Sequence, residues 1–232
     1  MVAEPVSSPY GAVVPGPNYW PMLREICDRY GCLLIADEVI TGFGRTGKMF
    51  GADHWGLEPD LMLFGKTLAS GYMPIGATIT TTEVAEKFIG SGKEFVMAHT
   101  LSGHPAGTAA ALANLDIIEQ ENLVDRSKKM GEYLLTRIET LMDHHIVGEV
   151  RALGLLAAVD LVKDKNTKEA LGDPIIGRKM TRFMLDNGLY FYTHGSRFEI
   201  HPCLTITGEE IDEMVSILDR TVGYAEKEMG IA

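Results

Sequence analysis

The stretch YWPMLREICDRYGCLLIADEV, residues 19–39, decides the fold class. Its first part repeats apolar side chains at helical spacing, and Gly31 is suited to end that helix. Its second part, CLLIADEV, is a short apolar run that ends in charge, which is typical of a buried strand. A helix followed by such a strand predicts an α/β protein with a parallel sheet. The residues at helical spacing are Trp20, Leu23, Ile26, Cys27 and Tyr30.

Further elements follow from the same patterns. The character of the chain changes near Asp125, so we expect a sheet-and-helix block before it and a smaller α+β block after it. Thr207 and Glu210 form a capping-box pattern at the start of a closing amphipathic helix. Strands are expected over 60–66, 76–81, 149–162 (as one strand or a pair broken at a glycine) and 198–207, and helices over 105–123, 124–145, 177–189 and 207–229.

Composition narrows the class of protein. The formal net charge is -11, from 32 acidic and 21 basic residues. This charge disfavours nucleic acid and anionic membranes as partners and leaves small molecules as candidates. Three cysteines without metal-type spacing indicate a reducing compartment, and no signal peptide or membrane-length apolar run is present. His99 and His104 make a weak metal pattern, so we interpret them as hydrogen-bonding loop residues. We expect a cytoplasmic protein without a metal.

The segment GFGRTG, residues 42–47, matches the dinucleotide-binding pattern G-x-G-x-x-G after a predicted strand. That motif requires a helix opening at its glycines, so that a pyrophosphate lies at the helix N-terminus. The residues that follow, KMFGADHWGLEPD, have no helical period, and Asp37 precedes the glycines instead of following them. We therefore predict a tight glycine loop.

An acid and an amine follow two predicted buried strands. Asp37 comes at the end of LLIAD, and Lys66 comes directly after DLMLFG. Ligands collect at the carboxyl ends of the strands in an open parallel sheet, so these two side chains are candidates for one site. The alternative is that Asp37 ends its strand in solvent and Lys66 extends its charged head into water. Residue types alone leave both interpretations open.

Three consecutive motifs resemble the signatures of class III aminotransferases, the omega-amino-acid and amine transaminase branch of the fold-type I pyridoxal-phosphate enzymes. They are LLIADEVITGFGRTG (33–47), GKTLASGYMPIGA (65–77) and HTLSGHPAGTAAALANL (99–115). The resemblance runs along nearly the whole chain. It implies that residues 1–125 are the C-terminal part of the cofactor-binding large domain and that residues 126–232 are the small C-terminal α+β domain.

The resemblance also assigns roles. Lys66 matches the lysine that forms the Schiff base with the cofactor, pyridoxal 5'-phosphate, and then transfers a proton between substrate carbon and cofactor carbon. Asp37 matches the acid that pairs with the pyridine nitrogen. Val39 matches the apolar residue on one cofactor face, with plain core packing as the alternative. Thr100 matches a threonine that donates to the cofactor phosphate of the neighbouring subunit, which implies a homodimer.

Two positions depart from the family pattern. Ser7 stands where many relatives have a glutamine that bonds the phenolic oxygen of the cofactor. Tyr192 stands where relatives have the arginine that binds the substrate carboxylate, and a tyrosine cannot make that bidentate pair. Arg197 lies nearby in the sequence and is the candidate to replace it.

The resemblance covers only the C-terminal half of the family's length, so we expect a partial chain that binds the cofactor weakly and exposes apolar surface. The expected function is transfer of an amino group from an amine or omega-amino acid to a 2-oxo acid such as pyruvate. One alternative is an incomplete chain with a folding or oligomerising role only. Another is an isomerase or lyase on the same scaffold.

Overall fold

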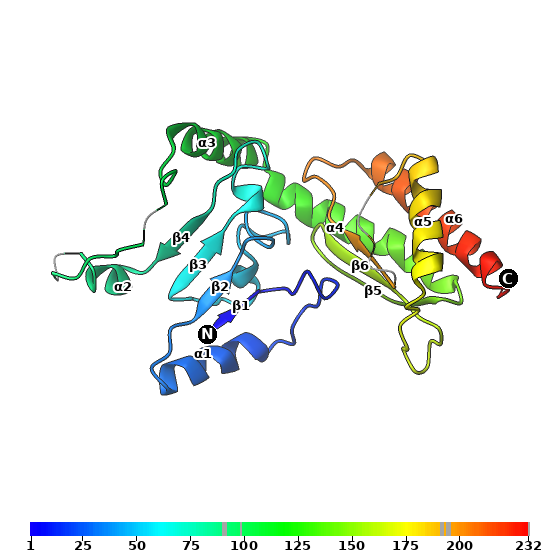
Figure 1. The fold of residues 1–232 in the computed structure, drawn as a ribbon, viewed down its shortest axis with the longest axis horizontal. Helices are drawn as coiled ribbons and strands as arrows, with labels where there is room; N and C mark the ends of the chain where they lie inside the picture. The colour runs from blue at the N-terminus through cyan, green and yellow to red at the C-terminus, as the bar shows by residue number, and fades with distance from the viewer. Residues whose placement is uncertain (90–91, 98, 191–192, 194–195, 232) are drawn as a thin grey trace. The chain divides into compact units, whose positions relative to one another are not determined.

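The computed structural model describes residues 1–89, 92–97, 99–190, 193 and 196–231 (Figure 1). The chain divides into two compact units. The first contains Met1–Val6 and Val14–Val124, and the second contains Ser7–Val13 and Asp125–Ala232. The short segment Ser7–Val13 therefore packs with the second unit, although its sequence neighbours belong to the first.

The first unit is built on a four-stranded sheet. Its strands are β1 (Val2–Ala3), β2 (Ile35–Asp37), β3 (Leu61–Phe64) and β4 (Ala77–Thr80), in that spatial order. The first three run parallel, and β4 runs antiparallel to β3. The helices of this unit are α1 (Tyr19–Arg29), α2 (Thr82–Glu86) and α3 (Pro105–Gln120). A mostly parallel sheet with helices confirms the predicted α/β class.

Helix α1 packs only a narrow side against the sheet. Trp20 and Cys27 are buried in one cluster with Leu34, the residue before β2. Ile26 and Tyr30 share the helical spacing of these residues but are exposed. The buried stripe is thus narrower than the sequence spacing indicates, and β2 is shorter than the apolar run that predicts it.

A loop between β2 and β3 is fastened to the sheet by the buried side chain of Glu38. This carboxylate is 1% exposed and accepts hydrogen bonds from Thr41 Oγ1 at 2.5 Å, Gly51 N at 2.9 Å and Ala52 N at 2.8 Å. Burial raises the pKa of Glu38, and these three donors offset only part of that rise. Glu38 is therefore an anchor for the loop.

The glycines of GFGRTG form turns within this loop. Gly44 and Gly47 adopt positive φ, and the next helical element is η1 (Gly51–His54), a short 3-10 turn. The long helix that a dinucleotide motif needs does not follow. The predicted glycine loop is confirmed.

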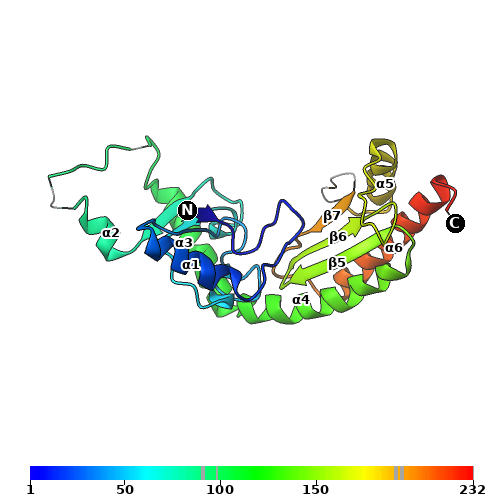
Figure 2. The same cartoon turned by 90° about the horizontal axis from the view of Figure 1, so that it is seen from below.

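The second unit is a three-stranded antiparallel sheet with helices against one face. Its strands are β5 (Val147–Leu153), β6 (Leu156–Leu161) and β7 (Arg197–Ile200), in that order. The other elements are α4 (Leu123–Glu139), η3 (Thr140–Asp143), α5 (Pro174–Asp186) and α6 (Gly208–Glu228). Figure 2 shows α4 and α6 beneath the sheet. The predicted strand pair over 149–162 is a hairpin that turns at Gly154, with φ 57°.

The start of α6 agrees with the sequence. Thr207 Oγ1 accepts from Glu210 N at 3.2 Å, and Glu210 Oε2 accepts from Thr207 N at 2.8 Å, so the capping box is confirmed. The strand predicted over 198–207 is shorter in the structure, because β7 ends at Ile200.

Candidate functional site

Asp37 and Lys66 leave the sheet at the same edge. β2 and β3 pair in parallel from Ile35↔Leu61 to Asp37↔Leu63, and Glu38 N donates to Leu63 O at 3.0 Å. Asp37 is the last residue of β2, and Lys66 comes two residues after the end of β3. Because the carboxyl ends of parallel strands share one edge, the fold places the backbones of these two residues at the same edge of the sheet, and their joint site stays a prediction.

The residues around this edge alternate between the two faces of the sheet. Glu38 and Phe64 are buried, whereas Asp37 and Val39 are half-buried. A Cβ built on Gly65 would lie 3.4 Å from Val39 Cγ1, so Val39 flanks the backbone that leads into Lys66. Val39 therefore belongs to the same edge as Asp37 and Lys66.

The carboxylate of Asp37 is held by the backbone beside it. Its Oδ1 accepts from Val39 N at 3.1 Å. Among the described residues, no hydrogen bond engages the other oxygen, Oδ2. Asp37 thus has one oxygen fixed and one available as an acceptor for an external N–H group.

Lys66 is exposed and sits on a strained turn. It adopts φ 36°, in the left-handed region that L-residues avoid, and it opens the 3-10 turn η2 (Lys66–Leu68). In the part of the chain that the structure describes, Lys66 has no ion-pair partner. An amine in this position is accessible to a reagent, and its backbone conformation is imposed by its surroundings.

Thr100 lies in the segment between α2 and α3 and is exposed. Next to it, Ser102 N donates to His99 O at 2.9 Å. His104 caps α3, since its Nδ1 accepts from Ala106 N at 3.2 Å. The interpretation as a hydrogen-bonding loop residue is confirmed for His104 and stays a prediction for the side chain of His99. No described hydrogen bond joins Thr100 to Asp37 or Lys66.

Ser7 and Arg197 belong to the second unit, and Tyr192 lies outside the described residues. Ser7 forms a short bridge with Val13, with N–O distances of 3.1 and 3.0 Å. Arg197 Nε donates to Asp160 Oδ1 at 2.5 Å. The role of Ser7 toward a cofactor and those of Arg197 and Tyr192 toward a substrate carboxylate stay predictions.

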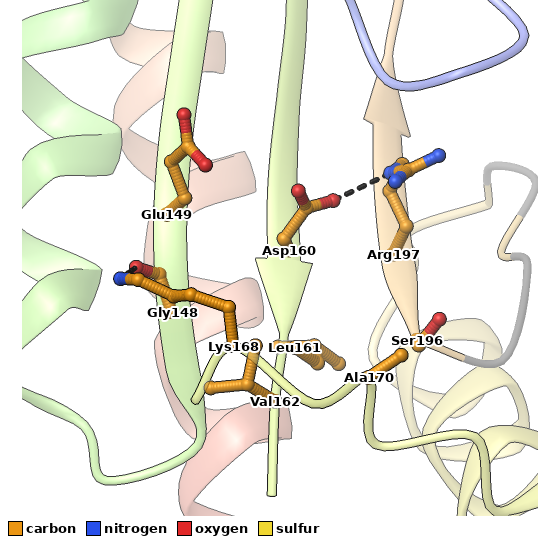
Figure 3. Close-up of a pocket in the computed structure, with 9 residues that line it drawn as sticks. All are labelled: Gly148, Glu149, Asp160, Leu161, Val162, Lys168, Ala170, Ser196 and Arg197. Atoms are coloured by element: carbon orange, nitrogen blue, oxygen red, sulfur yellow. Dashed lines mark hydrogen bonds and ion pairs between the residues drawn. The ribbon is translucent and has the colours of Figure 1, made fainter. Parts of the chain in front are cut away.

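Arg197 also lines a small pocket on the sheet of the second unit (Figure 3). Its wall includes Asp160 and Lys168, and Lys168 Nζ donates to Gly148 O at 2.7 Å. The pocket volume is about 120 Å³. At about 30 Å³ per water molecule, this space suits a few waters and is too small for a cofactor.

One residue near Lys66 escaped the sequence analysis. Asn114, on α3, donates through Nδ2 to the carbonyl oxygens of Thr67 at 2.7 Å and Leu68 at 3.3 Å. Its Oδ1 accepts from Ser70 Oγ at 2.7 Å. A polar residue such as Asn114 in an alanine-rich helix gives no sequence signal that it reaches a turn more than forty residues earlier in the chain.

Comparison with known proteins decides the family. The family model for aminotransferase class-III matches residues 1–222. The chain belongs to the class III aminotransferases. This class III chain is 41% identical over 226 residues to a putrescine–pyruvate aminotransferase of Pseudomonas aeruginosa, covering 95% of this chain and 49% of the relative. It is 38% identical to a taurine–pyruvate aminotransferase of Bilophila wadsworthia, covering 100% and 53%. The chain thus spans about half the length of the curated relatives it matches.

Solved structures identify the fold of this class III chain as fold type I. An amine transaminase from an uncultivated Pseudomonas species, described in its PLP-bound form, superposes with a TM-score of 0.91 at 42% identity. That match covers 97% of this chain and 52% of the other. Class III aminotransferases depend on pyridoxal 5'-phosphate.

The residues of the strand edge fit that cofactor. An aldehyde needs an accessible amine, which Lys66 offers, and a pyridinium N–H needs an acceptor, which Asp37 Oδ2 offers. Among the described residues, no group of three or more His, Cys, Asp or Glu side chains is arranged to hold a metal ion. No helix within the described ranges is long and apolar enough to cross a membrane.

Proposed function

We propose that the protein containing this chain is a PLP-dependent transaminase that moves an amino group from an amine or omega-amino acid to a 2-oxo acid such as pyruvate. The observation that carries the proposal is the shared edge of β2 and β3, where Asp37 and Lys66 leave neighbouring parallel strands. Unit 1 would be the C-terminal part of the cofactor-binding large domain, and unit 2 the small domain.

When bound, pyridoxal phosphate supplies an aldehyde that condenses with amines and a ring that accepts electrons from the substrate carbon. Lys66 would be the amine of the chain that binds the aldehyde, and its freed Nζ would take the proton from the substrate carbon and deliver it to the cofactor carbon. Asp37 has its Oδ1 held by Val39 N, and its free Oδ2 would accept the pyridine N–H. Val39, which lies beside Gly65, would pack on one face of the ring.

Pyruvate as the acceptor is supported by the relatives. The putrescine and taurine aminotransferases carry pyruvate in their names, and their donors are an amine and an aminosulfonate. Neither donor has an α-carboxylate.

The first test uses borohydride reduction of the 232-residue chain with pyridoxal phosphate, followed by peptide mass analysis. We expect the adduct on Lys66 and its loss in Lys66→Ala, with Lys66→Arg as a charge-preserving control that also loses it. A wild-type adduct on another lysine, or one that persists at the same level in Lys66→Ala, would contradict the proposal.

The second test follows products with an amine donor and pyruvate, because only transamination makes alanine from pyruvate. It is made on the chain alone and on the longest protein in which the chain occurs. Alanine formation that depends on Lys66 supports the proposal. Rearranged or cleaved amine without alanine would assign an isomerase or lyase instead, and adduct without any turnover in either protein would leave a binding role only.

We also propose a homodimer in which Thr100 donates to the cofactor phosphate of the partner subunit. Its support is the apolar exposure of the surrounding segment, because large patches of this kind mark interfaces. The exposed side chains are Phe95 (70%), Val96 (88%), Met97 (70%) and Leu101 (73%). Sedimentation should show a dimer that Val96→Asp dissociates, whereas Lys129→Asp, on an exposed face of α4, should not. A monomeric wild-type chain would contradict this.

A further inference from the structure

The turn that carries Lys66 is closed by few backbone bonds. Leu68 N donates to Gly65 O at 2.8 Å, whereas Ala69 N and Ser70 N reach Lys66 O and Thr67 O only at 3.3 Å. Lys66 and Ser70, at either end, adopt φ values of 36° and 48°. Two left-handed non-glycine residues within one turn persist only where the surroundings impose them. A side chain outside the turn must therefore contribute.

Asn114 supplies that restraint. Its Nδ2 donates to the carbonyls of Thr67 and Leu68, the two residues after Lys66, and its Oδ1 accepts from Ser70 Oγ at the far end. The amide orientation is fixed by chemistry, because the reverse orientation would set Oδ1 against two carbonyl oxygens. One side chain thus bonds three of the five residues of the turn.

The helix is built to bring Asn114 to the turn. Gly107, Ala111 and Ile118 are its buried residues and share a face with Asn114 at spacings of three and four. A Cβ on Gly107 would lie 3.7 Å from Ile75 Cδ1, so small residues on this face let α3 approach the chain that follows the turn. Figure 1 shows α3 beside the chain that follows β3, and η2 contacts α3.

We propose that Asn114 is a positioning residue for Lys66: it holds the turn Lys66–Ser70 in the strained conformation that presents the amine at the strand edge. Asn114 touches only the turn, so it acts through the backbone of Lys66 and not on any reacting atom. The catalytic relevance of Asn114 rests on the proposed function. The restraint of the turn by Asn114 is a property of the cofactor-free chain and can be tested without it.

The test compares Asn114→Leu and Asn114→Asp with Ala113→Asp, which adds the same charge at the neighbouring, exposed position of α3. Hydrogen exchange of the amides of residues 68–72 is measured in the cofactor-free chain. We expect both Asn114 variants to exchange at least tenfold faster than wild type at pH 7.5, and Ala113→Asp to match wild type. At pH 3, below the ordinary aspartate pKa of about 3.9, Asn114→Asp should approach wild type at that pH, because a protonated carboxyl again donates to Thr67 O, whereas Asn114→Leu should not.

A second readout is specific to Lys66. Competitive amine labelling between pH 7 and 9 gives its reactivity relative to Lys129, an exposed lysine of α4. We expect this ratio to change at least threefold in Asn114→Leu and Asn114→Asp and not in Ala113→Asp. Wild-type values for both exchange and labelling in folded Asn114 variants would overturn the proposal. If Asn114→Leu does not fold, Ser70→Ala replaces it in the test, because it removes only one donor to Asn114. Hydrogen exchange and amine labelling are then measured in the same way.

The capture of pyridoxal phosphate separates the two proposals. If Asn114 positions Lys66, the rate of adduct formation at Lys66 should fall about tenfold in Asn114→Leu. Absence of any adduct in wild type would refute the proposed function. The exchange and labelling results would still test whether Asn114 holds the turn. Normal adduct formation in Asn114→Leu together with a loosened turn would overturn the positioning role.

Discussion

Val39 and Gly65 lie against each other at the carboxyl edge of the sheet, where a Cβ on Gly65 would stand 3.4 Å from Val39 Cγ1. The extended backbone of Gly65 leads directly into Lys66, whose φ of 36° is left-handed. Gly65, whose backbone is relaxed, is thus directly followed by Lys66, whose backbone is strained. This places the conformational strain of the edge on the lysine itself, which is where a fixed amine is needed.

Strain at Lys66 predicts an unusual ranking of variants. Lys66→Gly should be more stable than Lys66→Ala by about 1 kcal/mol, because only glycine adopts left-handed φ without steric cost. Both variants lack the amine, so the comparison isolates the backbone. Urea unfolding of the two chains measures the difference. Equal stabilities, or a more stable alanine variant, would show that the turn is not strained.

Loss of the Glu38 carboxylate should detach the loop between β2 and β3. Glu38→Ala leaves Gly51 N, Ala52 N and Thr41 Oγ1 without their acceptor in the core, at a cost of about 3 kcal/mol. Asp53→Asn is the control, because the exposed Asp53 carboxylate accepts from Phe50 N in the same loop. Thermal unfolding should show a large loss for the first variant and less than about 1 kcal/mol for the second. Similar losses would mean that the loop has no buried anchor.

The packing of the segment Ser7–Val13 should depend on Gly11. Gly11 has φ 88°, Arg151 Nε donates to its carbonyl at 2.9 Å, and a Cβ there would lie 2.4 Å from Arg197 Nε. Gly11→Ala should therefore loosen the segment, at about 2 kcal/mol, and expose it to proteases. Gly16→Ala, where a Cβ meets nothing within 4 Å, is the matched control. Equal cleavage of both variants would contradict this packing.

The sequence predicts the parts of the site that follow strand ends. Asp37 and Lys66 are found because apolar runs stop at them, and a parallel sheet brings such ends to one edge. Asn114 is not found, because its partners are backbone carbonyls of a turn distant in the sequence. The packing of Ser7–Val13 with the second unit is missed for the same reason, since Arg151 reaches Gly11 across 140 positions. Local patterns do not encode such tertiary hydrogen bonds.

Two helical glycines should respond in opposite directions to alanine. A Cβ on Gly131, in α4, would stand 2.3 Å from the backbone of Gly154 at the β5–β6 turn. Gly131→Ala should destabilise by about 2 kcal/mol because that backbone must move. Gly223, in α6, has only His144 Cε1 at 3.7 Å, so Gly223→Ala should stabilise by up to about 1 kcal/mol through helix propensity. Chemical unfolding of both variants checks the signs, and a stabilised Gly131→Ala would contradict the close approach.

His144 joins the segment between η3 and β5 to helix α6 through two carboxylates. Its Nδ1 lies 2.9 Å from Glu226 Oε2, and its Nε2 lies 3.0 Å from Asp219 Oδ1. Both ring nitrogens donate only in the protonated ring. Burial opposes the charge, but the hydrogen bonds to Glu226 and Asp219 outweigh it and raise the pKa of His144.

This arrangement predicts how stability depends on pH. Because the pKa of His144 is raised above its unfolded value of about 6.5, its contribution is complete below that pH and is lost as pH rises through the folded pKa. Burial of Glu226 opposes its charge, but His144 lowers its pKa overall, so its contribution is complete above about 4.5 and is lost in acid. The contribution of this pair to the free energy of unfolding should therefore be greatest between about pH 4.5 and 6.5 and fall as pH rises toward 9.

The variant His144→Gln should flatten the alkaline side of this profile, because glutamine does not titrate. His145→Gln is the matched control, since His145 is the exposed neighbour in the chain. Urea unfolding at half-unit steps from pH 4 to 9 gives the three profiles. If His144→Gln keeps the wild-type slope between pH 6.5 and 9 while the control also keeps it, the link between β5 and α6 is not protonated and the assignment is wrong.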